Sequence, residues 1–489
     1  MQRFLCLAVL IPVIAVLLLG SPPASSQNDK AVEKVIGGKA LVMMGDKTGA
    51  YVAHHTEDES FVRAAVAAGL WHSVRTSGAA DRRAPRILLR SGWQVVNIGD
   101  VGHTPGALAL IERHIPEAEV VVWASGSMTA EVVAMMTRRF PKLKVVTGTL
   151  GADGKASKKD LGDAVAWADF FLLGSGASLN ARADIDAFVK HTGKPFGVYS
   201  ITHGGRYTGP KDKGVLDQAR FAFFRDSVSL ALAQKQGVKA PVVEWGPDAA
   251  FAVDIRDDKT AAAFLGKHGL EAGKFLAFIP KLRYTPYWKI RGHQKPQTEQ
   301  EKTFWKRTQE TMEPDHAKLR EALIAFVRKT GMKVLLCPED SSHMEVNRTL
   351  VFDKLPDDVR AKAVVRDTFW GMDEAVAVYA QAFALLSYDM HSPIMAVNQG
   401  TPSIVVRTEE QSSKGFMWKD IGLGEWLFDL DAEKDGSGLA KALLAMAADP
   451  AAARKKVAEA MAFVRKRQKE TMAVVARELA RWDENKGRE

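Results

Sequence analysis

The chain has 489 residues and contains only two cysteines, Cys6 and Cys337. Cys6 lies in an apolar stretch at the N-terminus, so a mature chain without that stretch would keep a single thiol. One thiol cannot form an internal disulfide, and the sequence therefore excludes a disulfide-stapled fold. Because Cys337 follows the apolar residues 334–336, we expect it to be a small buried hydrophobic residue and not a nucleophile.

Signatures of metal and nucleic-acid binding are also missing from the sequence. It has no zinc-ligand spacing, no RNP-type aromatic motif and no internal repeat. We therefore expect no metal and no nucleic-acid partner. The formal net charge is +9, and part of it lies in two basic runs at 454–456 and 465–467. These runs are typical of solvated helix faces, and the alternative is attraction to an anionic polymer such as an acidic polysaccharide.

The sequence has one long hydrophobic run, residues 4–19, which follows Arg3 and leads into small residues at 20–26. A basic start, an apolar core and a small-residue exit predict a signal peptide over residues 1–24, cleaved after Ala24. Cleavage would lower the net charge to +8 and leave no stable membrane span. The alternative is an uncleaved anchor. We expect a protein that is secreted, or placed in the periplasm or cell envelope.

Behind the leader, apolar strands alternate with helical patterns, which indicates an α/β fold with parallel sheets covered on both faces. We predict two Rossmann-like, doubly wound domains that face a cleft. In our prediction, a strand at 95–98 precedes a helix opened by Thr104 and Pro105. Further strands are predicted at 144–147, 170–173, 275–279 and 384–387. The predicted organisation has four parts after the leader: an irregular N-terminal extension with a helix at 58–71 (25–91), two Rossmann-like domains (92–254 and 255–430) and C-terminal helices (431–489).

Five short segments in the chain form an ordered set, at 97–100, 168–176, 224–229, 246–251 and 389–391. The set resembles the polysaccharide pyruvyl transferase family. The resemblance implies a GT-B type fold and a transferase that moves pyruvate from phosphoenolpyruvate to two sugar hydroxyls as a ketal. It implies a polysaccharide or oligosaccharide partner and no cofactor, with phosphoenolpyruvate as co-substrate.

The chain departs from the family pattern at Asp389, where the resemblance leads us to expect an arginine that helps to hold the phosphoenolpyruvate anion. A carboxylate inverts the local charge, so we expect weak binding of this donor unless other cations serve. Lys281 and Arg283, with Lys289 and Arg291, follow the first strand of the second domain and could do so. The alternatives are a carbohydrate-modifying or carbohydrate-degrading enzyme without this donor, and a catalytically silent glycan-binding protein.

His391 is the candidate general base, because imidazole can accept a proton from a sugar hydroxyl near neutral pH. The neighbouring Asp389 could orient it or keep it protonated, and the alternative for His391 is a capping role. Arg225 is the candidate cation for a phosphate or carboxylate. For Asp226, which follows it, we favour a structural ion pair with Arg225 over a role in the site.

The remaining candidates are substrate-binding residues. Gly99 and Asp100 could place backbone N–H groups around an anion, or they could form a tight turn in which Asp100 caps the helix. The triplet Gly174, Ser175 and Gly176 allows a close approach of the backbone to a ligand, as a plain turn would also explain. Arg283, Tyr284 and Trp288 could bind and stack on sugar rings, or they could pack in a surface loop.

Overall fold

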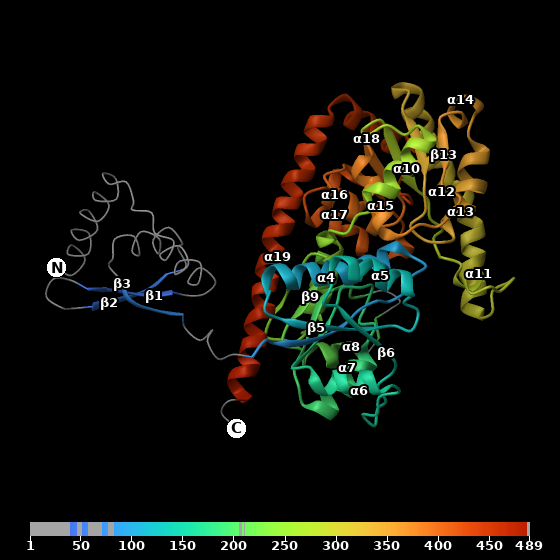
Figure 1. Cartoon of the computed structure of the whole chain (residues 1–489). Coiled ribbons are helices and arrows are strands. Elements are labelled where there is room, and N and C mark those ends of the chain that lie inside the picture. The colour runs from blue at the N-terminus through green and yellow to red at the C-terminus, as the bar shows by residue number, and fades with distance from the viewer. Residues whose placement is uncertain are drawn as a thin grey trace, which may run out of the picture. The chain divides into compact units, whose positions relative to one another are not determined.

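The computed structural model describes residues 40–45, 51–56, 71–76 and 83–486, except 205–207 and 210, and side chains are described from residue 83 to residue 481. The predicted leader lies outside these residues. The chain divides into two units, residues 1–84 and 85–489, which are described separately (Figure 1).

The first unit contains a three-stranded antiparallel sheet in the order β2-β1-β3. Its strands are β1 (Ala40–Gly45), β2 (Tyr51–Thr56) and β3 (Trp71–Thr76). The prediction of an irregular extension is therefore wrong for these segments. Most of the predicted helix at 58–71 lies outside the described residues, and its last residue, Trp71, begins β3.

The second unit opens with a seven-stranded sheet whose strands are all parallel, in the order β10-β9-β8-β7-β4-β5-β6. Its strands are β4 (Arg86–Arg90), β5 (Glu119–Ala124), β6 (Lys144–Thr147), β7 (Phe170–Leu173), β8 (Phe196–Ile201), β9 (Ala222–Phe224) and β10 (Val243–Trp245). The helices of this part are α4 (Ile98–His114), α5 (Ala130–Arg139), α6 (Lys159–Trp167), α7 (Arg182–Thr192), α8 (Asp212–Leu216) and α9 (Ser227–Lys235).

A six-stranded parallel sheet follows, in the order β13-β12-β11-β14-β15-β16. Its strands are β11 (Phe275–Ile279), β12 (Lys333–Leu336), β13 (Ala363–Val365), β14 (Ala384–Ser387), β15 (Ser403–Arg407) and β16 (Leu427–Asp429). The helices here are η2 (Ala249–Ala252) and α10 (Asp258–His268) before β11, then α11 (Tyr287–Ile290), α12 (Glu299–Thr330), α13 (His343–Val346), α14 (Asp357–Arg360), α15 (Met372–Gln381), α16 (His391–Asn398) and α17 (Met417–Asp420).

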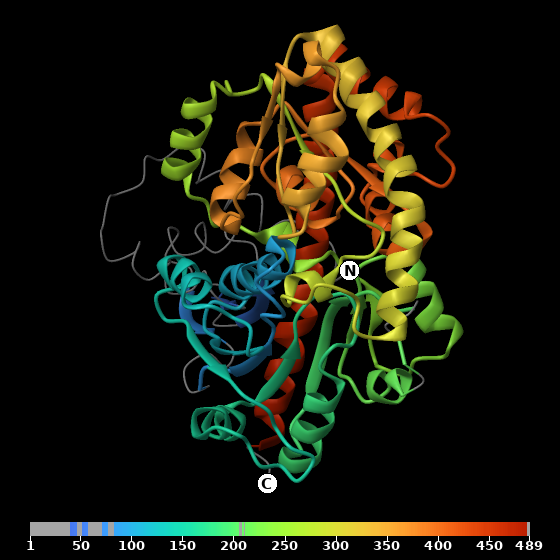
Figure 2. The same ribbon diagram turned by 90° about the vertical axis from the view of Figure 1, so that its right-hand side faces the viewer.

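The burial of the central strands fits two parallel sheets that are covered by helices on both faces. Every residue of β7, β11 and β14 is buried, as expected for strands that helices cover on both faces. Figure 2 shows helices around each sheet, with the first sheet's part in blue to green and the second's in yellow to orange. The predicted α/β class is confirmed, with two Rossmann-like domains in the GT-B arrangement.

The predicted C-terminal helices are α18 (Ser437–Ala448) and α19 (Pro450–Lys486). The last helix returns to the first sheet, where the Tyr199 and Thr471 hydroxyls lie 3.0 Å apart and Arg467 Nε donates to the Trp245 carbonyl. Figure 1 shows α19 beside both parts. Among the described helices, none has the length and apolar character needed to cross a bilayer.

Two predictions at the start of the first Rossmann-like domain are wrong. The domain was expected to begin at residue 92, but β4 already lies between β5 and β7 in the sheet. The expected strand at 95–98 is absent, because α4 begins at Ile98 with Asn97 as its N-cap. Pro105, which we placed in the first turn of that helix, lies inside it. The Ile98 N–H donates to the Glu339 carbonyl at 2.9 Å, so a tertiary contact supports the earlier start.

Candidate active site

Each parallel sheet has a point at which its strand order reverses, and ligands of such sheets bind outside the strand carboxyl ends at that point. In the first sheet the reversal lies between β4 and β7. The triplet that begins at Gly174 follows β7, and the Gly174 N–H donates to the Arg90 carbonyl at the end of β4 (3.0 Å). Ser175 is fully buried there. The triplet therefore lies at the carboxyl edge of the sheet, where the sequence predicted it, after a strand.

In the second sheet the reversal lies between β11 and β14. Lys281 follows β11 and Asp389 follows β14, and their side chains form a buried ion pair across this point. Both residues were predicted site residues, and the fold places them at the carboxyl edge of the second sheet.

Two histidines, one from each domain, are in contact between the carboxyl edges of the two sheets. The rings of His103, on α4, and His391, at the start of α16, meet edge to face with centroids 4.8 Å apart. Gly99 makes this approach possible, because a Cβ on it would lie 2.4 Å from His391 Nδ1. The close contact with the candidate base is a different role for Gly99 from the anion binding that we predicted.

His103 belongs to a buried polar network of the first domain. Its Nδ1 lies 2.6 Å from Ser175 Oγ and 3.1 Å from Asp248 Oδ1. Arg225 donates to the other oxygen of Asp248 at 2.8 Å and, through Nε, to Thr202. Burial would raise the pKa of Asp248, but His103 and Arg225 hold it well below its usual range. Arg225 is therefore a buried, paired cation beside the two histidines.

Asp226 has a structural role, although not the ion pair with Arg225 that we favoured, because Arg225 pairs with Asp248. Its Oδ1 accepts from the Ser229 N–H at 2.8 Å and so caps α9. Arg225 and Asp226 are adjacent in the sequence but have different partners, because Arg225 bonds to Asp248 and Asp226 caps α9.

Glu339 is the carboxyl group next to His391. Its Oε1 lies 3.5 Å from His391 Nδ1, and its Oε2 accepts from the Ser392 N–H at 2.7 Å. Its side chain is fully buried, and burial together with the nearby Asp389 raises the pKa of Glu339 to about 7. A carboxyl group in this state can donate a proton near neutral pH.

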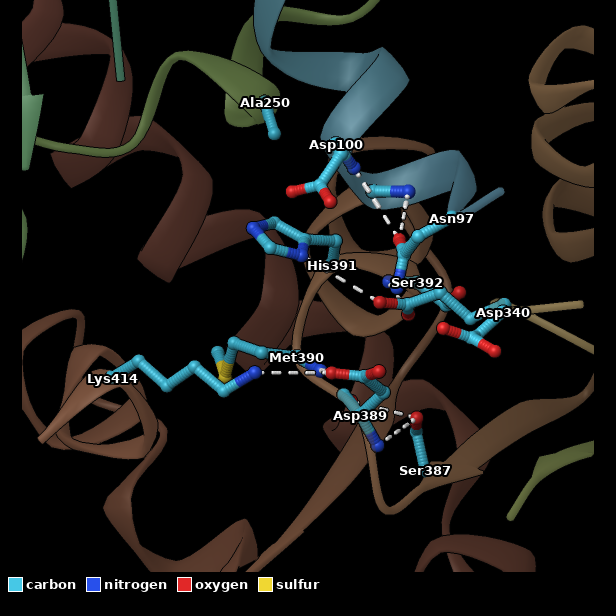
Figure 3. Close-up of polar contacts among 12 residues, drawn as sticks. Asn97, Asp100, Ala250, Asp340, Ser387, Asp389, Met390, His391, Ser392 and Lys414 are labelled. Atoms are coloured by element: carbon cyan, nitrogen blue, oxygen red, sulfur yellow. Dashed lines mark hydrogen bonds and ion pairs between the residues drawn. The ribbon is translucent and has the colours of Figure 1, made fainter. Parts of the chain in front are cut away.

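Asp389 does not hold His391 in the way we predicted. Its carboxylate is bonded to Lys281 on one oxygen and to Lys414 on the other, the latter at 3.1 Å. Figure 3 shows the contact with Lys414. Burial would raise the pKa of Asp389, yet these two ammonium groups lower it well below its usual value. Asp389 thus binds two cations, and Glu339 is the carboxyl group at the His391 ring.

Buried polar atoms that lack a hydrogen-bond partner among the described residues gather around this cluster. They are His103 Nε2, Glu339 Oε1, Asp340 Oδ2, His343 Nε2 and His391 Nε2. Buried polar atoms normally have partners, so this concentration indicates a place for ligand groups. It includes Asp340 and His343, which follow β12.

The state of His391 depends on its surroundings. Burial, followed by the field of His103, lowers the pKa of His391 to about 3, and Arg225 and Lys414 act in the same direction. The imidazole is therefore neutral at physiological pH, as a proton acceptor must be. An anion bound beside it would raise its pKa again.

The start of α4 does not offer free N–H groups to an anion. Asn97 Oδ1 accepts from the Gly99 and Asp100 N–H groups at 2.7 and 3.3 Å, and the Asn97 carbonyl accepts from Val101 (Figure 3). Asp100, which we considered as the cap, instead accepts from the side chain of Gln94. The cap is Asn97, and the anion-binding alternative for this turn has no support.

The aromatic stretch after β11 packs on itself. The Tyr284 ring stacks on Phe304 with centroids 4.0 Å apart, and the buried Trp288 meets Trp305 edge to face at 5.4 Å. Arg283 is buried in ion pairs, with its Nε 2.7 Å from an Asp315 oxygen. These contacts favour the packing alternative over sugar stacking for all three predicted residues.

Among the described residues, two groups of side chains have donor atoms within 4.8 Å of one another: His103, Asp248 and His391, and Glu339, Asp389 and His391. In both groups a carboxylate is already paired, Asp248 with Arg225 and Asp389 with lysines. A metal ion would compete with these cations. That the reaction needs no metal stays a prediction.

Sequence reasoning missed the roles of Glu339, Lys414 and, as individual residues, His103 and Asp248. Glu339 follows β12 by three residues, so the rule that ligands meet strand carboxyl ends could have found it. Asp248 lies in the segment 246–251 of the family resemblance, and His103 lies three residues after the segment 97–100. Lys414 lies in a loop without any such signal.

Comparison with known proteins identifies a family whose pattern spans most of this cluster. The family model for polysaccharide pyruvyl transferase matches residues 97–410, which is well over half of the chain and includes every member of the cluster except Lys414. The amylovoran biosynthesis protein AmsJ of Erwinia amylovora is 29% identical over 257 residues, which are 50% of this chain and 56% of that protein. The chain thus spans about half the length of this curated relative.

Solved structures with similar folds are more distant. MnaA of S. aureus, with UDP, has a TM-score of 0.48 at 12% identity and covers 77% of this chain and 91% of its own. Anabaena Alr3699/HepE, with UDP and glucose, has a TM-score of 0.48 at 11% identity and covers 81% of this chain and all of its own. The extent of the family match decides the assignment: the chain belongs to the polysaccharide pyruvyl transferase family.

Proposed function

We propose that the protein is a transferase that moves pyruvate from phosphoenolpyruvate to two hydroxyls of a polysaccharide or oligosaccharide as a ketal. The observation that carries the proposal is the pairing of a neutral imidazole, His391, with a buried carboxyl of raised pKa, Glu339, 3.5 Å away. Pyruvyl transfer needs both a proton acceptor for a hydroxyl and a proton donor for the enol carbon.

The chemistry balances with these two groups. Glu339 protonates C3 of the enol, and the first sugar hydroxyl adds to C2 while its proton passes to His391. The bond between C2 and the phosphate oxygen then breaks, and His391 returns its proton to the departing phosphate. The second hydroxyl attacks C2 to close the ketal, and its proton restores Glu339.

The cations of the cluster support an anionic donor. Asp389 alone would repel phosphoenolpyruvate, which was the basis for expecting weak binding. Its carboxylate is bonded to two ammonium groups, Lys281 and Lys414, so the trio carries one net positive charge. That is the sign of the arginine expected from the family, supplied here by two lysines. Arg225 adds a further cation, paired to Asp248.

Export is a separate part of the proposal. It rests on the leader pattern of residues 1–24, and it places the acceptor outside the cytoplasm, as an envelope or secreted glycan. AmsJ, the similar protein of Erwinia amylovora, is described as acting in amylovoran biosynthesis, and this is consistent with a glycan acceptor.

The test is an assay of the mature protein with phosphoenolpyruvate and a panel of neutral and acidic glycans. We expect release of inorganic phosphate together with an acid-labile pyruvate ketal on one class of glycan, both lost in His391→Asn. Glycan binding without phosphate release would instead support a binding protein. Glycan cleavage in the absence of phosphoenolpyruvate would support a carbohydrate-degrading enzyme.

A further inference from the structure

A polar cavity of about 260 Å³ lies apart from the His391 cluster. Its walls come from the end of α4, the segment after η2, the end of α16 and the middle of α19. The segment after η2 and α19 are the two connections between the sheets, and α19 also contacts α4 and α16 (Figure 1). The cavity therefore borders both domains and both connections between them.

The charges around the cavity are mainly positive. Arg113, Arg256 and Arg465 line it, together with one acid, Asp254. The Asp254 carboxylate is bonded to Arg139, at 2.9 Å, and Arg256 is bonded to Asp258. Within residues 83–481, outside the gaps at 205–207 and 210, neither Arg113 nor Arg465 has a hydrogen-bond or ion-pair partner.

A second observation points to a missing acceptor in the same place. Gln468, one turn along α19 from Arg465, lines the cavity and is only 1% exposed. Its side-chain Nε2 is itself buried and has no hydrogen-bond partner in the part of the chain that the structure describes. A buried amide donor without an acceptor is costly, and an oxyanion in the cavity would supply that acceptor.

We propose that this cavity is a binding site for a phosphate group, either inorganic phosphate or a phosphate ester. Guanidinium groups bind tetrahedral oxyanions through paired charge-assisted hydrogen bonds, and Arg113 and Arg465 are available for them. The Gln468 amide completes the donor set. An occupied site would join α4 and α16 to α19, so its ligand stabilises the relative position of the two domains.

The solution test is calorimetric titration of the full chain at low salt with inorganic phosphate and, separately, with glucose 6-phosphate. The variant is the double change Arg113→Gln and Arg465→Gln. Arg454→Gln, on the exposed face of the same helix, is the matched control. We expect the double variant to weaken one binding event by about tenfold or more, with the control within about twofold of wild type. Tighter binding of glucose 6-phosphate would identify a phosphate ester, and equal binding would identify free phosphate.

The location is tested by anomalous diffraction from crystals soaked in tungstate, which is a heavy mimic of phosphate. We expect a peak between Arg113 and Arg465 in the wild type and none in the double variant. The site would be overturned if the double variant bound phosphate as the wild type does. It would also be overturned if crystals showed a tungstate peak but calorimetry detected no phosphate binding in solution. Neither result bears on pyruvyl transfer, because none of these side chains belongs to the His391 cluster.

Discussion

The imidazole rings of His103 and His391 meet edge to face, with an interplanar angle of 83°. His103 comes from the helix that follows β4, and His391 from the helix that follows β14, so the contact joins the carboxyl edges of the two sheets. Each ring uses Nδ1 within its own domain, toward Asp248 and Glu339 respectively, and leaves Nε2 without a partner. Both Nε2 atoms are buried, so the cluster contains two ring nitrogens for which the described residues supply no partner.

Replacement of His391 tests the general base. Asn keeps a polar group but cannot accept the hydroxyl proton, so we expect His391→Asn to lower kcat by about a hundredfold or more. The melting temperature should change little. His191→Asn, an exposed histidine on α7, is the matched control and should leave kcat unchanged. Full activity with a large loss of stability would instead assign His391 a capping role.

Glu339→Gln tests the proton donor through pH. Glutamine mimics the protonated carboxyl but cannot release a proton, so we expect a large fall in kcat. In the wild type, kcat should decrease as pH rises through about 7, where Glu339 loses its proton.

The difference in stability between Glu339→Gln and the wild type should change with pH as Glu339 of the wild type titrates. Because the folded pKa of Glu339 is raised, its contribution to stability is present below its unfolded pKa and is lost as pH rises through the folded value. We therefore expect the melting temperature of the variant, relative to wild type, to increase between pH 5 and pH 8. A difference that is independent of pH would show that Glu339 does not titrate in this range.

The sequence predicted the parts of the fold that depend on continuous apolar strands. The strands at 170–173, 275–279 and 384–387 were predicted with the bounds that the structure has, and each of their residues is buried, as continuous apolar runs in a parallel sheet should be. The strand at 144–147 was also predicted with its observed bounds, although it lies at the sheet edge and is only partly buried. The start of α4 was mispredicted, because the N–H of its first residue, Ile98, donates to the Glu339 carbonyl, 241 residues away in the sequence.

The candidate site was predicted only where a strand end or a motif marked it. His391, Ser175, Lys281 and Arg225 are brought together around the two points of strand reversal. The partner of each residue was less predictable, because pairing depends on how the domains meet. Asp389 was expected to serve His391, but two lysines bind it, one of them from a loop 25 residues later in the chain.

The leader yields a prediction about the mature N-terminus. Protein recovered from the envelope or medium of the native host should begin near Ser25, because the apolar run ends in small residues suited to cleavage. N-terminal sequencing or intact-mass measurement checks this. Recovery of chains that begin at Met1 in the cytoplasm would remove the argument for export and leave the proposed chemistry intact.

Gly99→Ala tests whether the contact between α4 and His391 is needed. The added Cβ would lie 2.4 to 2.5 Å from atoms of the His391 side chain, too close for either group to stay in place. We expect a loss of stability of about 1–3 kcal/mol, together with a fall in kcat comparable to that of His391→Asn. Gly266→Ala is the matched control, because its Cβ would meet no atom within 4 Å on α10. It should stabilise the protein by up to about 1 kcal/mol. Normal kinetics in Gly99→Ala would show that the position of His391 is not critical.

Lys414→Gln tests whether two lysines replace the expected family arginine. The change leaves Asp389 with Lys281 alone, so the trio loses its net positive charge while the buried carboxylate keeps one partner. We expect phosphoenolpyruvate to bind about tenfold more weakly, in accord with the loss of one charged hydrogen-bond donor. The protein should still fold, since the Lys414 side chain is 18% exposed.

Lys419→Gln, on α17, removes the same charge nearby and should change binding by less than about twofold. Calorimetric titration at low salt measures both variants. If phosphoenolpyruvate binds the wild type and Lys414→Gln equally well, the donor is held elsewhere, with Arg225 as the next candidate. If the wild type does not bind it at all, Asp389 defines a different donor, and the reaction proposed for this cluster is wrong.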